Sequence, residues 1–210
     1  MNIIDLSHDI AVGMPVFPGD PQVLILNHQN YQDGYLIHNV FIGTHCGTHV
    51  DAPLHKNPKT NAIDEISIEK FIVKAYVMDV TFLTPKQELT EKHLEKIKSK
   101  IKGINAIIFK SNWSLQYESE NYFSDFPGIS EGAAKWIIKN KISLIGLETP
   151  SVSVEKHKEI HEALLSKDIT IVEGLANVDK ITKEYVEFYA VPLKIKGLDG
   201  SPVRAFAIED

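Results

Sequence analysis

Short apolar runs bounded by turn residues dominate the first part of the chain. Runs of this length, rich in β-branched residues, predict strands rather than helices. The expected strands are 2–7 (NIIDLS), 22–28 (QVLILNH), 35–43 (YLIHNVFIG) and 72–82 (IVKAYVMDVTF). The segment FPGDP (17–21) separates the first two, because Pro, Gly and Asp together are strong turn signals.

Beyond this region, helical spacing alternates with short buried strands. Thr90 is the expected N-cap of a helix that ends at Lys100, and Ser130 that of a helix that ends at Asn140. A third helix is expected over 154–167, where apolar residues recur on one face. Further strands are expected over 104–110, 142–148, 169–175 and twice within 186–209, the last two joined as a hairpin near Asp199-Gly200.

This order of elements predicts one mixed α/β domain over residues 1–210. Strands pair antiparallel at the two ends of the chain, and helices alternate with strands in its middle. A chain of this length is long enough to bury a substantial apolar core.

Composition narrows the class of protein. The chain is 43% hydrophobic and 24% charged with a net charge of −6, which does not resemble the basic surface of a nucleic-acid binder. Its one cysteine, Cys46, excludes an internal disulfide framework, and we expect it to be a small buried residue. No apolar run approaches a membrane span, and the first residues lack the basic region of a signal peptide. We therefore expect a cytoplasmic protein that does not bind membranes.

The segment THCGTHVDAPLH (44–55) concentrates metal-binding side chains. His45, His49, Asp51 and His55 all have odd numbers, so an extended chain would present them on one face. At roughly 3.3 Å per residue, His45 and His49 would lie about 13 Å apart in a straight strand, too far to share one ion. Gly47 permits the necessary bend. Imidazole with carboxylate suits Zn²⁺, Mn²⁺ or Fe²⁺.

The same segment resembles the H-x-G-T-H-x-D-x-P-x-H signature of the metal-dependent cyclase and kynurenine formamidase family. The segments DLSHDI (5–10), VFPGDP (16–21), LIGLETPSV (144–152) and ITIVEGLANVD (169–179) also resemble family landmarks. The resemblance implies a three-layer β/β/α fold of the swivelling-domain type with a mixed sheet. It also implies assembly as a homodimer or a higher homo-oligomer.

The resemblance further implies roles for individual residues. His45, His49, Asp51, His161 and Glu173 would be ligands of divalent metal, with Asp51 able to bridge two ions, either Zn²⁺ or Mn²⁺. Glu173 also fits this role on its own, because a carboxylate that ends an apolar strand needs a partner.

Two further residues are assigned by the same resemblance. His55 would be the catalytic acid/base, and its ordinary pKa suits proton transfer near neutral pH. Phe17 stands where bacterial kynurenine formamidases have a substrate-stacking Trp. It is alternatively a core Phe beside a turn.

Several positions depart from the family pattern, among them KSNW (110–113), which stands where many relatives have Thr-Gly-Trp. Glu148 and Ser153 replace two Asp residues of the landmark at 146–153, and Phe17 replaces Trp. These differences concern the substrate rather than the metal.

We therefore expect a metal-dependent hydrolase that cleaves an aryl formamide such as N-formyl-L-kynurenine, a small-molecule amide. Two alternatives stay open. The same site could act on a cyclic amide such as isatin or on another cyclase substrate, or the protein could hold metal or ligand without turnover. A serine hydrolase is not expected, because the chain has no Gly-x-Ser-x-Gly motif.

Overall fold

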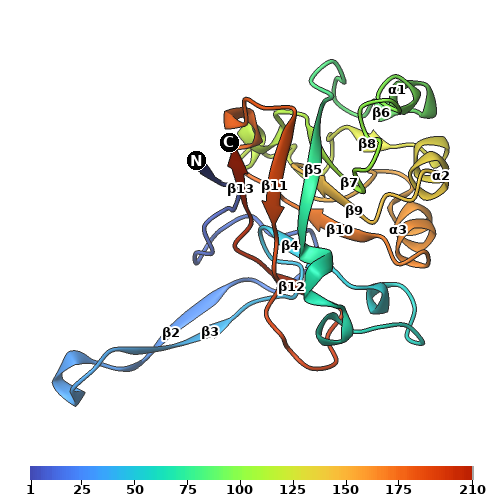
Figure 1. Cartoon of the computed structure of the whole chain (residues 1–210). Helices are drawn as coiled ribbons and strands as arrows, with labels where there is room; N and C mark the ends of the chain where they lie inside the picture. The colour runs from blue at the N-terminus through green and yellow to red at the C-terminus, as the bar shows by residue number, and fades with distance from the viewer. Residues whose placement is uncertain (210) are drawn as a thin grey trace.

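The computed structural model of the chain describes residues 1–209. One nine-stranded mixed sheet forms its centre, with three helices on one side (Figure 1). The strands of this sheet, in spatial order, are β1 (Asn2–Asp5), β13 (Phe206–Glu209), β11 (Tyr185–Tyr189), β5 (Ile72–Asp79), β7 (Ala106–Lys110), β9 (Leu144–Leu147), β10 (Thr170–Glu173), β4 (His49–Asp51) and β12 (Gly200–Pro202). The helices are α1 (Glu91–Glu95), α2 (Glu131–Lys139) and α3 (His157–Leu165).

The sheet is parallel in the middle and antiparallel at both ends. Strands β5, β7, β9 and β10 run parallel, whereas their neighbours β11 and β4 run antiparallel to them. This arrangement confirms the predicted antiparallel ends and the α/β alternation between them. Parallel neighbours need crossover connections, and α2 and α3 supply two of them.

Each face of the sheet is buried by a different layer. On one face, the strand residues Ile107, Ile145 and Ile171 share a core with Trp136 of α2 and Leu164 of α3. On the other face, residues from opposite ends of the sheet share one core, among them Ile4, Phe188, Val50 and Val172. The sheet therefore curls until its antiparallel ends cover its parallel centre. This gives three layers and confirms the expected β/β/α fold.

Helix α2 forms as predicted. The Ser130 hydroxyl accepts a hydrogen bond from the Ala133 backbone N–H at 3.2 Å, and the helix ends at Asn140. Helix α1 begins after Thr90 as expected, but the prediction that it extends to Lys100 was wrong. Beyond Glu95 the chain continues as single turns with i to i+3 hydrogen bonds. Ile97 and Ile101 are buried in the core all the same, and turns of this tighter kind are common at the ends of α-helices.

The two late strands pair antiparallel with each other as predicted, but the prediction of a tight turn between them at Asp199-Gly200 was wrong. Strand β12 begins at Gly200 and pairs with β4, while β11 pairs with β13. Asp-Gly is a turn signal in a local hairpin, but here the long-range pairing with β4 determines the conformation.

Two smaller sheets complete the structure. Strands β6 (Glu88–Leu89) and β8 (Gly128–Ile129) pair beside the helices. Strands β2 (Leu24–Gln29) and β3 (Ile37–Phe41) form a hairpin that extends away from the body of the molecule (Figure 1). Within residues 1–209, no helix is long and apolar enough to cross a membrane.

Candidate metal centre

Strands β4 and β10 bring three acidic and imidazole side chains together. His49 lies directly opposite Glu173 in the antiparallel register, and Asp51 is two residues further along β4 on the same face. The His49 Nε2 atom is 3.5 Å from Glu173 Oε2 and 3.5 Å from Asp51 Oδ1. All three side chains are buried, whereas the intervening Val50 points into the opposite core.

The predicted bend at Gly47 is present. Gly47 has a φ of +61°, the left-handed conformation that glycine adopts most easily. As a result, the ring centroids of His45 and His49 are 5.1 Å apart rather than about 13 Å. His45 Nδ1 lies 2.7 Å from Asp51 Oδ1, so the chain curls around one carboxylate.

Helix α3 contributes His161 from above this strand pair. Its Nε2 atom is 3.1 Å from Glu173 Oε1 and 3.3 Å from Asp51 Oδ2. Its Nδ1–H donates to the His157 backbone carbonyl at 2.6 Å, just as His49 Nδ1–H donates to the Gly47 carbonyl at 2.9 Å. Because a carbonyl oxygen can only accept, the Nδ1 atom of each ring carries a proton and is used by the backbone. The Nε2 atom of each ring is therefore the one that faces the carboxylates. This second hydrogen bond is the usual support of a metal-binding histidine.

His55 reaches the same cluster by a different backbone conformation from the one predicted. It ends a 3-10 turn, Pro53–His55, rather than continuing the extended ligand segment, so its odd number does not explain its position. Its ring centroid is nevertheless 4.1 Å from that of His45 and 5.8 Å from that of His161. His55 is partly exposed and lies at the outer edge of the cluster.

Asp199 is a member of the cluster that the sequence reasoning missed. Its Oδ2 atom is 2.9 Å from His45 Nε2 and 3.2 Å from His55 Nδ1. Asp-Gly is a local turn signal, and nothing in the neighbouring sequence links it to residues about 150 positions earlier. The following Gly200 is also required, because a Cβ there would lie 2.8 Å from His45 Cε1.

The charges of the cluster are strongly coupled. Burial alone lowers the pKa of His49, but hydrogen bonds to Asp51 and Glu173 outweigh it and raise the pKa to about 10. For His161, burial again opposes the two carboxylates, which raise the pKa to about 10. Burial likewise lowers the pKa of His45, but Asp51 and Asp199 raise it to about 9. The buried carboxylates thus require positive charge beside them.

A divalent cation fits this requirement. Two groups of three potential ligand atoms, each within 4.8 Å of one another, share Asp51: His45, Asp51 and His55, and His49, Asp51 and Glu173. Within residues 1–209, Asp51 Oδ2 is one of four buried side-chain atoms that lack a hydrogen bond. A buried carboxylate oxygen without a hydrogen bond, lying beside an imidazole, is the chemistry expected of a metal ligand.

Comparison with known proteins agrees with this geometry. The sequence pattern of the putative cyclase family matches residues 4–154. The chain belongs to this family. Similar proteins include a kynurenine formamidase of Salinibacter ruber, 30% identical over 212 residues that cover 98% of this chain and 96% of that protein. Another is a kynurenine formamidase of Sphingopyxis alaskensis, 28% identical over 99% of this chain and 98% of that protein.

Solved structures of similar fold include isatin hydrolase A from Labrenzia aggregata, with a TM-score of 0.88 and 24% identity. That comparison covers 98% of this chain and 93% of the other. A predicted metal-dependent hydrolase from Bacillus stearothermophilus has a TM-score of 0.80 and 24% identity over 98% of this chain and 97% of its own. These likenesses show the cyclase-family fold. With the curated relatives, they identify the chain as a hydrolytic enzyme of this family.

The departures from the cyclase-family pattern have structural explanations at two positions. Glu148 is fully buried, and its carboxylate accepts hydrogen bonds from the backbone N–H groups of Ser111 and Asn112 and from the hydroxyls of Ser111 and Ser114. It therefore fixes the loop after β7. The Ser153 hydroxyl accepts a hydrogen bond from the Lys156 N–H at 3.2 Å, immediately before α3.

Phe17 and Cys46 each contact a side chain outside the metal cluster. Phe17 is half-buried and packs edge-on against Phe123, with ring centroids 5.7 Å apart. Cys46 is buried, and its thiol contacts Met14 Sδ at 3.6 Å, which confirms the expected small core residue.

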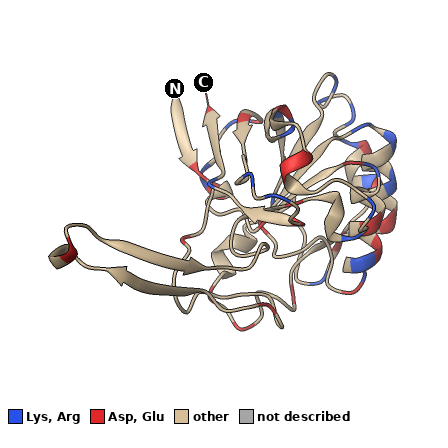
Figure 2. Ribbon diagram, turned by 90° about the horizontal axis from the view of Figure 1, so that it is seen from below, with Lys and Arg blue, Asp and Glu red and all other residues tan. Residues whose placement is uncertain are grey.

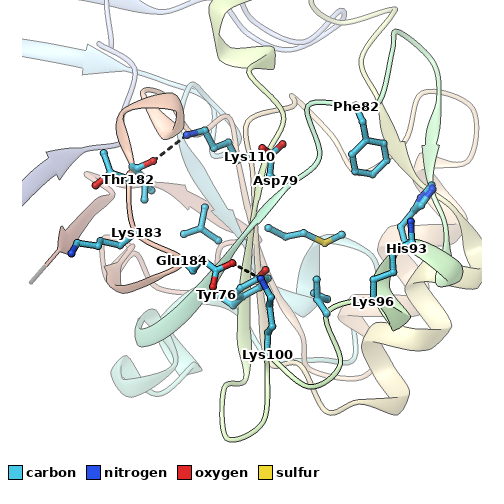
Figure 3. A pocket seen from close by; sticks show the side chains of 14 residues that line it. Tyr76, Asp79, Phe82, His93, Lys96, Lys100, Lys110, Thr182, Lys183 and Glu184 are labelled. Carbon is cyan, nitrogen blue, oxygen red and sulfur yellow. Dashed lines mark hydrogen bonds and ion pairs between the residues drawn. The ribbon is translucent and has the colours of Figure 1, made fainter.

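A separate cavity of about 390 Å³ lies between the end of β5, the α1 region and the segment before β11 (Figure 3). Its lysines are already engaged in part: Lys100 pairs with Glu184, and Lys110 donates to the carbonyls of Asp179 and Ile181. None of the side chains of the metal cluster line it.

Proposed function

We propose that the protein hydrolyses an aryl formamide of the N-formyl-L-kynurenine class with the help of two divalent cations. The observation that supports this most directly is the cluster of His45, His49, His161 and Glu173 around the Asp51 carboxylate, with the partly exposed His55 beside it. The kynurenine formamidases similar to this chain over nearly its whole length support the choice of substrate.

The chain would hold the cations with five residues. His45 and Asp51 would serve one ion, and His49, Asp51, His161 and Glu173 the other. Asp199 accepts from His45 Nε2, which leaves the Nδ1 atom that faces Asp51 as the ligand atom. Nitrogen and carboxylate ligands suit Zn²⁺ and Mn²⁺. When bound, such cations lower the pKa of water and polarise a carbonyl group.

His55 would move the proton in this reaction. Its Nδ1–H donates to Asp199, so Nε2 is left as the atom that accepts and returns a proton. Burial has the largest effect on His55 and lowers its pKa. The negative charge of Asp51 raises this pKa and the positive charge of His45 lowers it, and the pKa remains below its ordinary value. A neutral imidazole at pH 7 can take a proton from water and deliver it to the leaving amide nitrogen.

Phe17 would contribute to binding the aromatic ring of the substrate. It is half-exposed, and its contact with Phe123 fixes one edge of the ring. An apolar face held in this way suits stacking on an aryl group. A cytoplasmic location and assembly as a homodimer or higher homo-oligomer remain predictions.

The test is a turnover assay of purified protein loaded with Zn²⁺ or Mn²⁺, using N-formyl-L-kynurenine, simple formanilides and isatin. We expect hydrolysis of formamides that is abolished by a chelator and restored by metal. Activity on isatin alone would indicate that the substrate is a cyclic amide rather than a formamide. Metal binding without turnover of either class would indicate a binding module instead.

A further inference from the structure

The cavity in Figure 3 has a buried apolar lining. It has a volume of about 390 Å³ and is separate from the metal cluster. Its buried lining residues come from β5, from the turns after α1 and from the segment before β11: Tyr76, Val77, Met78, Ile97 and Ile181. Side chains of this kind remove the apolar part of a ligand from water, and a cavity of this volume accommodates a small molecule.

Two aromatic side chains lie on one side of this cavity (Figure 3). Phe82 is 54% exposed, and its ring packs against the His93 ring with centroids 5.0 Å apart. An exposed ring that is supported in this way is suited to stacking on an aryl group. The His93 Nδ1 atom accepts from the Thr90 N–H at 3.1 Å, so a neutral His93 carries its proton on Nε2 and can donate a hydrogen bond to a ligand.

The cavity also gathers positive charge. Over the helical side of the molecule, lysines and acidic residues are interspersed (Figure 2). The lining of the cavity has four lysines but only two carboxylates, although the chain as a whole has a net charge of −6. These residues are Lys96, Lys100, Lys110 and Lys183, with Asp79 and Glu184. An anion is therefore attracted to this cavity in spite of the negative charge of the chain.

The two carboxylates neutralise only part of this charge. Glu184 pairs with Lys100, whose ammonium also lies 5.6 Å from the centre of the Tyr76 ring. The Asp79 carboxylate accepts from the Thr81 N–H at 2.9 Å and from the Thr81 hydroxyl at 2.7 Å. Within residues 1–209, no lysine nitrogen lies within 4.0 Å of it. In this part of the chain, the other three lysines of the cavity thus have no carboxylate partner.

Lys110 is the most enclosed of these three. Its half-buried side chain donates to the backbone carbonyls of Asp179 at 2.9 Å and Ile181 at 3.0 Å, at the edge of the cavity (Figure 3). Both acceptors are uncharged, and the third N–H of the ammonium group remains for a ligand. A partly buried charge without a counter-ion is unfavourable, and an anion in the cavity would compensate it. Lys96 and Lys183 are exposed and can turn to the same anion.

We propose that this cavity binds a small aromatic carboxylate. The aryl group would lie against Phe82 and the apolar lining, and the carboxylate would accept from Lys96, Lys110 and Lys183. A phosphate compound fits less well, because the lining has no arginine and no glycine-rich loop and its buried part is apolar. None of the metal ligands lines the cavity, so this binding is independent of the reaction proposed above.

Isothermal titration calorimetry on the full, metal-loaded chain tests this with three probes: 2-naphthoate, the neutral 2-naphthamide and inorganic phosphate. We expect 2-naphthoate to bind with a dissociation constant on the order of 0.1 mM, which is reasonable for a ligand of this size. The amide lacks the charge and phosphate lacks the aryl group. Each should therefore bind at least about 10-fold more weakly.

Variants of the lining locate the bound carboxylate. The double variant K96Q/K183Q removes two charges from the cavity and should weaken the binding of 2-naphthoate by about 10-fold. The variant F82A removes the exposed ring and should weaken it by about 5-fold. The matched control K98Q/K102Q removes the same charge from two exposed lysines outside the cavity, and it should bind as the wild type does. Circular dichroism checks that each variant is folded.

The proposal fails if 2-naphthoate shows no binding at about 10 mM, 100 times the expected dissociation constant. Binding that is equally strong in K96Q/K183Q and in the control would place the carboxylate elsewhere, for example on the metal ions. Equal or tighter binding of phosphate or of the amide would exclude a carboxylate with an aryl group as the preferred ligand. Unchanged binding in F82A would exclude the aromatic contact.

Discussion

His49 and Glu173 occupy directly opposite positions on β4 and β10, and their side chains approach to 3.5 Å in the buried interior. Asp51 lies on the same face of the same strand pair. Two carboxylates are thus buried within reach of one imidazole, an arrangement that is unfavourable unless positive charge compensates them.

Metal removal should therefore destabilise the protein. A cation present at about 100 times its dissociation constant adds about 2.7 kcal/mol of stability, which corresponds to roughly 5–10 °C in melting temperature for a domain of this size. Calorimetry before and after chelation, with metal content measured by elemental analysis, checks this. An unchanged melting temperature after verified loss of metal would contradict the assignment of the cluster as a metal site.

Replacing His55 by alanine should separate proton transfer from metal binding. We expect metal content to be retained and the rate to fall by about 10²- to 10⁴-fold. His157→Ala is the matched control, because only the backbone carbonyl of His157 is used in the cluster. Loss of metal from the His55→Ala protein would instead make His55 a ligand, which its place in one of the two ligand groups allows.

Asp199→Asn should test the residue that orients His45 and His55. The amide is neutral and offers one acceptor oxygen, so the two histidines lose a shared ionic partner. We expect activity or metal affinity to fall by about 10- to 100-fold, the usual effect of removing an outer partner of a metal-binding histidine. Titration with metal and steady-state kinetics distinguish the two effects, and wild-type values in both would contradict the role.

Gly200→Ala should damage the centre without touching a ligand. The added Cβ would lie 2.8 Å from His45 Cε1 and 2.8 Å from the Val50 carbonyl oxygen, which is backbone and cannot move away easily. We expect lower metal content and a lower melting temperature. Gly132 lies in helix α2, and a Cβ added there would be 3.8 Å from its nearest neighbour, the Glu91 Cβ atom. The Gly132→Ala variant should therefore be as stable as the wild type or slightly more stable. Equal behaviour of the two variants would refute the steric argument.

The free energy of unfolding should depend on pH in part through the protonation of His8. This imidazole stacks on Tyr117 at 3.6 Å, and burial lowers its pKa to about 4. In the unfolded chain its pKa is near 6.5, so between these values the unfolded state binds more protons. His8 therefore favours folding at neutral pH and loses that contribution as the pH falls from about 6.5 to about 4.

His8→Phe keeps a stacking ring and removes the titrating group. Its melting temperature should fall less than that of the wild type when the pH is lowered from 7 to about 4.5. Differential scanning fluorimetry at several pH values measures this difference. Parallel curves for the two proteins would show that His8 does not titrate on unfolding.

The sequence by itself determined those features that depend on neighbouring residues. The Ser130 side chain caps α2 by accepting a hydrogen bond from the N–H of Ala133, three residues later. Gly47 bends the chain between His45 and His49, which are four residues apart. Backbone preferences and side-chain capping act over a single turn, so they can be recognised in a short segment. The apolar, β-branched runs of the parallel strands were recognisable for the same reason.

Only the tertiary structure decided which distant segments meet. Gly200 pairs with Asp51 because the sheet curls until β12 lies beside β4, and this pairing brings Asp199 to His45 and His55. The same dipeptide in isolation favours a hairpin turn, and Pro53 to His55 form a 3-10 turn where alternation predicted an extended chain. The burial of two packed sheet faces outweighs such local preferences, since it involves many more side chains than one turn does.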